Sequence, residues 1–335
     1  MNPLVGHKTF LDFFPAPEFL LLSTAGIAIT DVDTKFVQLK RDLFGNKFKL
    51  AHSNKAINPA GAVEAGLISN SAELIPVLKK LFSIYGVRYA YATLPEEKSY
   101  LFTTTIDQVP PEGLKDAVAF IVEENVPVSL AESVFDFEVV TVDRETKLMK
   151  VAVSVLPKSV VNSYIELFEA AGIVPISFDL ESQAIAKAII HRGDKRAHLI
   201  VNLSTRKTGF YIVEEEVVQF STTPAYGVGA DDSESDLEDL KAEMHKVFSF
   251  WNTRTDKLSK LENKIQKVTL CGLGANNKDF VDKLMTGVEV KYEFANVWLN
   301  TSSSRSRIPE MSFNESLDYA SAIGLVLSRH REKYV

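Results

Sequence analysis

Two stretches of the sequence combine hydroxyl and ammonium side chains that can hold phosphate oxygens. The first, residues 26–40, runs from an apolar segment through a polar turn into a second apolar segment. The second, residues 197–213, repeats that pattern. The candidate phosphate contacts of the two turns are Thr30, Asp31, Asp33, Thr34, Lys35, Ser204, Thr205, Lys207 and Thr208. Because the backbone N–H groups of such turns can point together, each hairpin is predicted to face a bound anion.

The repeated hairpin predicts a duplicated fold with a ligand cleft between its halves, and two unrelated surface hairpins are the alternative. Two glycine turns are candidates for the same cleft: Gly227 with Gly229, and Gly272 with Gly274. The second turn lacks the third glycine of a dinucleotide-binding turn. The sequence motifs of serine hydrolases, Walker-type ATPases and zinc proteases are missing. The six histidines have no ligand spacing, so no metal site is predicted.

Composition indicates a globular protein of 335 residues, long enough for two domains. The net charge of −7 argues against nucleic acid as a partner. The single cysteine excludes an internal disulfide and fits a reducing compartment, so a cytoplasmic location is expected. No apolar run is long enough for a membrane-spanning helix. The apolar N-terminus is broken by Asp12, Pro15, Pro17 and Glu18, which predicts a strap over the first domain; contact with a membrane or membrane protein is the alternative.

The elements that must position these turns follow a repeated β-β-β-α-β order. Hydrophobic periodicity and breakers predict the first copy at 26–30, 35–40, 46–52, 71–85 and 87–94. The second copy is predicted at 198–203, 208–213, 216–222, 231–253 and 268–271. A closing helix is expected at 315–329. We predict three parts: a first half (1–95, 176–195 and 315–330), an inserted α+β subdomain (96–175) and a second half (196–314).

Four segments of the chain resemble one family. They are residues 14–20, residues 26–40, residues 170–184, which are similar to the pattern AGL-x-P-x-x-x-D-x-E-S, and residues 318–327, which are similar to A-x-A-I-G-L-A-L. Together they resemble the PilM-like type IV pilus assembly proteins of the actin-like ATPase superfamily, which are related to FtsA. The resemblance covers essentially the whole chain. It implies an α/β fold of the actin-like ATPase (ribonuclease H-like) type with duplicated halves and a small α+β insert for protein interactions.

The chain departs from the superfamily where acidic side chains are expected. Ala28 and Thr30 stand in place of aspartate and glycine in the first hairpin, and Asn202 and Ser204 do so in the second. Without those carboxylates a hydrated Mg²⁺ loses its anchors. ATP and Mg²⁺ are thus the cofactors that the resemblance implies, with Glu181 in the place of a water-orienting catalytic acid. Phosphoryl transfer depends on positioning and metal electrostatics, so hydrolysis is expected to be weak or lost.

The resemblance implies a scaffold of the type IV pilus inner-membrane assembly platform, or of a related machine. Its partners would be the N-terminal cytoplasmic tail of a PilN-like bitopic membrane protein, other platform components and other copies of itself. The tail would bind between the first half and the insert, at the cytoplasmic face of the membrane. The alternatives are an active actin-like or DnaK-like ATPase or kinase, and an FtsA-like polymerising division protein.

Overall fold

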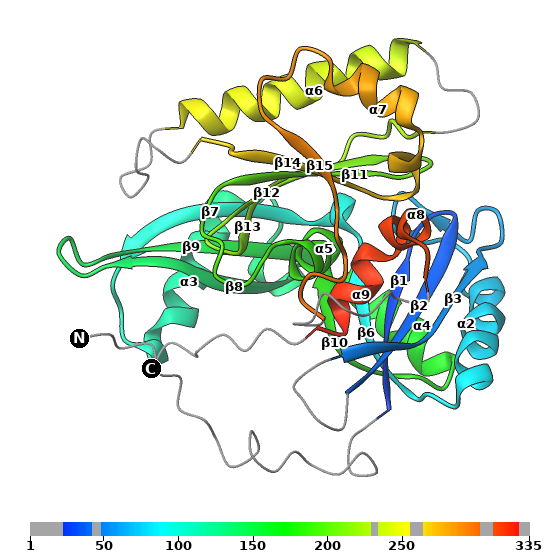
Figure 1. Ribbon diagram of the computed structural model, residues 1–335. Helices are drawn as coiled ribbons and strands as arrows, with labels where there is room; N and C mark the ends of the chain where they lie inside the picture. Colours follow the sequence, from blue (N-terminus) through cyan, green and yellow to red (C-terminus); the bar gives the residue numbers. More distant parts are fainter. Residues whose placement is uncertain (1–22, 42–47, 229–233, 255–263, 302–310, 328–335) are drawn as a thin grey trace.

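The first half of the chain forms a mixed five-stranded sheet (Figure 1). The computed structural model describes residues 23–41, 48–228, 234–254, 264–301 and 311–327. The strand order is β10 (Val174–Leu180), β6 (Tyr89–Leu94), β1 (Thr24–Ile29), β2 (Asp33–Arg41) and β3 (Phe48–Ile57). β10, β6 and β1 are parallel, whereas β2 and β3 are antiparallel to their neighbours. The predicted strands are therefore present, with β3 longer than expected and with Asp33 and Thr34 inside β2 rather than in the turn.

The second half repeats this sheet. Its order is β13 (Val217–Thr222), β12 (Thr208–Glu214), β11 (His198–Leu203), β14 (Lys267–Cys271) and β15 (Tyr292–Phe294). A central strand again has a parallel neighbour on one side and an antiparallel hairpin on the other. Because the same order and directions occur twice, the prediction of a duplicated fold is confirmed.

Helices cover these sheets as their apolar spacing predicts. α2 (Ser71–Tyr85) buries Leu74, Leu78, Leu81 and Phe82 on one face. It ends at Gly86, whose φ of 63° lets its N–H bond to the carbonyl of Phe82. α6 (Glu234–Thr253) and α7 (Lys278–Met285) lie over the second sheet (Figure 1). No helix in the described part of the chain is long and apolar enough to cross a membrane.

The insert is a three-stranded antiparallel sheet with one helix on its face. The order is β7 (Tyr100–Asp107), β9 (Leu148–Pro157) and β8 (Ser133–Asp143), and the helix is α3 (Pro111–Asn125). One face of β9, with Met149, Val151 and Val153, packs in a small core with α3. β9 is buried on its other face as well. The insert returns through α4 (Lys158–Ala170) to β10 of the first sheet.

The closing segment differs from the single helix expected at 315–329. It consists of α8 (Phe313–Ser316), a 3₁₀ turn (Leu317–Tyr319) and α9 (Ala320–Leu325), and residues 328–329 lie outside the described residues. α9 packs so closely on α5 (Glu181–Ile189) that a Cβ at Gly324 would overlap the carbonyl oxygen of Ala184. The break matters because the 3₁₀ turn carries Asp318 into a buried ion-pair cluster. The N-terminal strap predicted over the first domain also lies outside the described residues.

Candidate functional site

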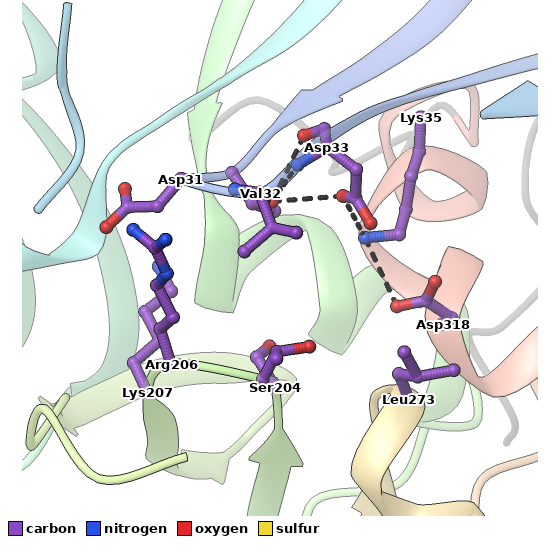
Figure 2. A pocket seen from close by; sticks show the side chains of 11 residues that line it. Asp31, Val32, Asp33, Lys35, Ser204, Arg206, Lys207, Leu273 and Asp318 are labelled. Carbon is purple, nitrogen blue, oxygen red and sulfur yellow. Dashed lines mark hydrogen bonds and ion pairs between the residues drawn. The ribbon is translucent and has the colours of Figure 1, made fainter. Parts of the chain in front are cut away.

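The two hairpin turns meet in a cleft between the halves of the molecule (Figure 2). The cleft contains about 390 Å³ of empty space, part of it open to solvent. Its lining residues are Thr30, Asp31, Val32, Asp33, Lys35, Ser204, Thr205, Arg206, Lys207, Leu273 and Asp318. Seven of the nine predicted phosphate contacts of the two turns therefore line it, all except Thr34 and Thr208.

Hydrogen bonds within the first turn hold its backbone in place. The Thr30 hydroxyl donates to Oδ1 of Asp33 at 2.9 Å and accepts from the N–H groups of Val32 and Asp33. The Asp31 carboxylate accepts from the N–H groups of Ala65 and Gly66. The N–H groups of Val32 and Asp33 and the carboxylate of Asp31 therefore bond within the protein rather than facing a ligand.

Two lysines and two aspartates form a closed ring of ion pairs on the first-half wall of the cleft. Lys35 Nζ lies 2.6 Å from Oδ1 of Asp33 and 3.1 Å from Oδ1 of Asp318. Lys55 Nζ lies 3.1 Å from Oδ2 of Asp318 and 4.0 Å from Oδ2 of Asp33. Burial lowers the pKa of Lys35, but the charges of Asp318 and Asp33 outweigh it and raise the net pKa. The lysine–aspartate ring thus pairs two ammonium groups with two carboxylates.

A third lysine links the two halves across the cleft. Lys207 Nζ, from the second turn, lies 2.7 Å from Oε1 of Glu97 and 2.9 Å from Oε2 of Glu181. Glu181 also accepts a hydrogen bond from the amide of Asn202, at 3.2 Å. Burial lowers the pKa of Lys207, but Glu181 and Glu97 raise it well above its usual value. We call this arrangement the Lys207 bridge. It joins the second sheet to the first half and to the start of the insert.

A neighbouring carboxyl group lies deeper than the Lys207 bridge. Glu96 accepts hydrogen bonds from the backbone N–H and the hydroxyl of Ser182. Burial raises the pKa of Glu96, and the bonds from Ser182 only partly offset this effect. Two consecutive glutamates after β6 thus face α5, one bound by an ammonium and the other by neutral donors.

A family model described as type IV pilus assembly protein PilM matches residues 26–234. The match includes most of the first half, the insert and the second hairpin, and it spans more than half of the chain. The chain belongs to the PilM family. A search of curated proteins finds no match.

Solved structures similar to this chain are also found. The chain superimposes on a structure of the PilM–PilN type IV pilus biogenesis complex with a TM-score of 0.75 and 17% identity, covering 91% of this chain and 97% of that one. EutJ, an ethanolamine utilization protein from Carboxydothermus hydrogenoformans, has a TM-score of 0.48 and 11% identity over 90% of this chain and 88% of its own. The cytoplasmic domain of EpsL from the type II secretion system of Vibrio cholerae has a TM-score of 0.44 and 9% identity, covering 74% and 82%.

The residues of this PilM family member do not fit a hydrated Mg²⁺ with a triphosphate at the cleft. Each pair of neighbouring carboxylates already holds an ammonium group: Lys35 lies between Asp33 and Asp318, and Lys207 lies between Glu97 and Glu181. Within the described ranges no three acidic, histidine or cysteine side chains are grouped as metal ligands.

Other predicted contacts of this PilM chain do not line the cleft. Thr34 and Thr208 are fully buried, since both lie at the start of strands buried on both faces there, and the Thr34 hydroxyl donates to Oδ1 of Asn58. A Cβ at Gly227 or Gly272 would overlap backbone atoms of the second hairpin, so these glycines permit close packing of turns. Gly274 packs against Val228. Gly229 lies outside the described residues.

Five residues at the PilM cleft were not predicted as site residues from the sequence: Val32, Glu97, Arg206, Leu273 and Asp318. The glutamate follows the predicted strand 87–94, and ligand-facing residues often follow the carboxyl ends of parallel strands. The position of Glu97 just after a predicted strand could therefore have identified it from the sequence. No local sequence pattern marks Asp318, because its role depends on its ion pair with Lys35, which is far away in the sequence.

Proposed function

We propose that this protein is a scaffold of a type IV pilus inner-membrane assembly platform that binds the cytoplasmic tail of a PilN-like bitopic membrane protein. The observation that carries the proposal is the PilM family match over residues 26–234, which includes the insert. The overlap with the PilM–PilN complex along almost the whole of both chains supports it. The tail would dock between the first half and the insert in an extended form.

The cleft is proposed to act as a structural joint with degenerate nucleotide binding. In an active ATPase of this fold, metal and phosphate charges would meet between the halves. Here the chain itself supplies the opposing charges: two lysines and two aspartates in the ring, and one lysine between two glutamates in the Lys207 bridge. The protein would then hold its binding surfaces in position without a catalytic cycle, as a scaffold requires. The proposed location is the inner face of the cell membrane, reached through the partner's tail.

The tail interaction is tested by fluorescence anisotropy with a labelled peptide of the partner's cytoplasmic tail. Saturable binding is expected, and a scrambled peptide of equal composition is the control. If the tail does not bind at about 100 μM protein, an interaction stronger than about 5–6 kcal/mol is excluded and the proposal fails.

A thermal denaturation series tests the proposal for the cleft. A nucleotide bound with a Kd one-hundredth of its concentration would stabilise the fold by about 2.7 kcal/mol and raise the melting temperature by several degrees. We expect Mg·ATP to raise it by less than about 1 °C relative to the same Mg²⁺ and ionic strength. A larger, Mg²⁺-dependent rise with release of phosphate would indicate an active ATPase instead.

A further inference from the structure

The insert carries the negative charge of the whole protein. Residues 96–175 contain 14 Asp and Glu residues against 6 Lys and Arg residues, a net charge of −8. The remainder of the chain has a net charge of +1. The excess of acidic over basic side chains is largest in the stretch through α3 and the first part of β8. Between residues 111 and 138 it has seven acidic side chains and one lysine; all of these are exposed except Glu138, which is half-buried. Such a concentration of one sign on one subdomain attracts ligands of the opposite charge.

β8 lies at an edge of the insert sheet. Within the described residues it pairs with β9 alone, and its 11 residues make it longer than most strands. Long open edges offer a row of backbone N–H and C=O groups to another strand, and proteins commonly protect them with lysine or proline. β8 contains neither. A bulge between Val139 and Thr141 interrupts its pairing, which leaves the regular part at Ser133–Val139.

The two faces of β8 differ in a way that selects a ligand. Phe135 and Phe137 pack toward the insert core with α3. Val134, Asp136 and Glu138 alternate on the other face, where Val134 (43%) and Asp136 are exposed and Glu138 is half-buried. A strand added beside β8 would place every second side chain next to this row. Opposite charges in such cross-strand positions attract, and like charges repel.

We propose that the edge of β8 from Ser133 to Val139 binds an extended peptide rich in Lys and Arg, supplied by the juxtamembrane part of the partner's cytoplasmic tail. This inference rests on the proposed function. Cytoplasmic segments close to a membrane-spanning helix carry an excess of Lys and Arg, which matches the charge of the insert. Main-chain hydrogen bonds would provide affinity, and the row of Val134, Asp136 and Glu138 would provide charge selectivity.

The test compares two double charge reversals in the full-length chain. Asp136→Lys with Glu138→Lys changes the edge, and Glu73→Lys with Glu289→Lys makes the same change in net charge at exposed sites on α2 and before β15. The probes are the labelled partner tail and two ten-residue peptides of alternating Lys-Val and Glu-Val. At low salt the edge variant should bind the tail and the Lys-Val peptide about tenfold or more weakly, whereas the control should lose less than about threefold. Circular dichroism checks folding, and Asp136→Lys alone is the milder variant.

Each outcome has one meaning. Equal losses in the two double variants, or binding of Glu-Val as strong as that of Lys-Val, would show a general charge effect and overturn the inference. Tail binding at full strength to the edge variant would also overturn it and leave the proposed function standing. If wild type binds the Lys-Val peptide but not the tail, the tail is not the occupant of the edge, and the inference and the proposed function both fail. Hydrogen exchange that slows in residues 133–139 on binding would confirm strand pairing.

Discussion

Replacement of Lys207 by methionine is expected to destabilise the protein by about 3–5 kcal/mol, the cost of leaving buried charges without their partner. The three side chains of the Lys207 bridge are between 10% and 15% exposed, so solvent screens them little. Methionine keeps most of the apolar stem and removes the ammonium. Glu97 and Glu181 then face each other without a cation, since the remaining donor to Glu181 is the neutral amide of Asn202.

The assay is urea unfolding followed by circular dichroism between pH 7 and pH 9. The raised pKa of Lys207 means that its stabilisation is fully present below the pKa of an unfolded lysine, near 10.4, and is lost only as pH rises through the folded value. The loss should therefore be constant over this range. Lys267→Met is the control, because its pair with Glu293 is 32% and 54% exposed and should contribute no more than about 1 kcal/mol. Equal losses for the two variants would refute the assignment of the Lys207 bridge as a joint.

Three further measurements test the packing and charge arguments. Gly324→Ala should destabilise the fold by about 1–3 kcal/mol in urea unfolding because its Cβ would overlap the carbonyl of Ala184. Gly113→Ala is the control and should be neutral or stabilising, since Gly113 has open space around it in α3. A larger loss of stability for Gly113→Ala than for Gly324→Ala would contradict the packing of α9 on α5. Cys271 is buried and its pKa is raised by that burial, so a thiol reagent should modify it only after unfolding, and fast labelling of the native protein would count against a closed core. Hydrogen bonds from a largely exposed arginine lower the pKa of Asp194, so Asp194→Asn should cost no more than about 1 kcal/mol at pH 7. The difference from wild type should shrink as pH falls below about 4 toward the lowered pKa of Asp194; a difference that stays constant between pH 5 and pH 2 would exclude an ionic origin.

Local sequence patterns predicted most of the elements. α2 and β11 begin and end at the residues that periodicity and breakers indicate. Proline at the start of α3 and glycine after α2 mark their ends, because each imposes a backbone geometry that depends only on neighbours in the chain. The closing helix was predicted wrongly. Its small residues suit a helix, but the 3₁₀ turn depends on packing against α5 and on the ion pairs of Asp318.

The candidate site, like the fold, could be predicted only in part from the sequence. The sequence by itself determined that two similar hairpins exist, that Ala28 and Asn202 replace acidic residues, and that an acidic insert lies between the halves, since these follow from residue type and order alone. Only the tertiary structure decided that Lys35 is bound by Asp318 and Lys207 by Glu97 and Glu181. The physical reason is that these ion pairs depend on sheet order and strand register, which bring residues from 26 to 283 positions apart into contact, and no local periodicity encodes those contacts.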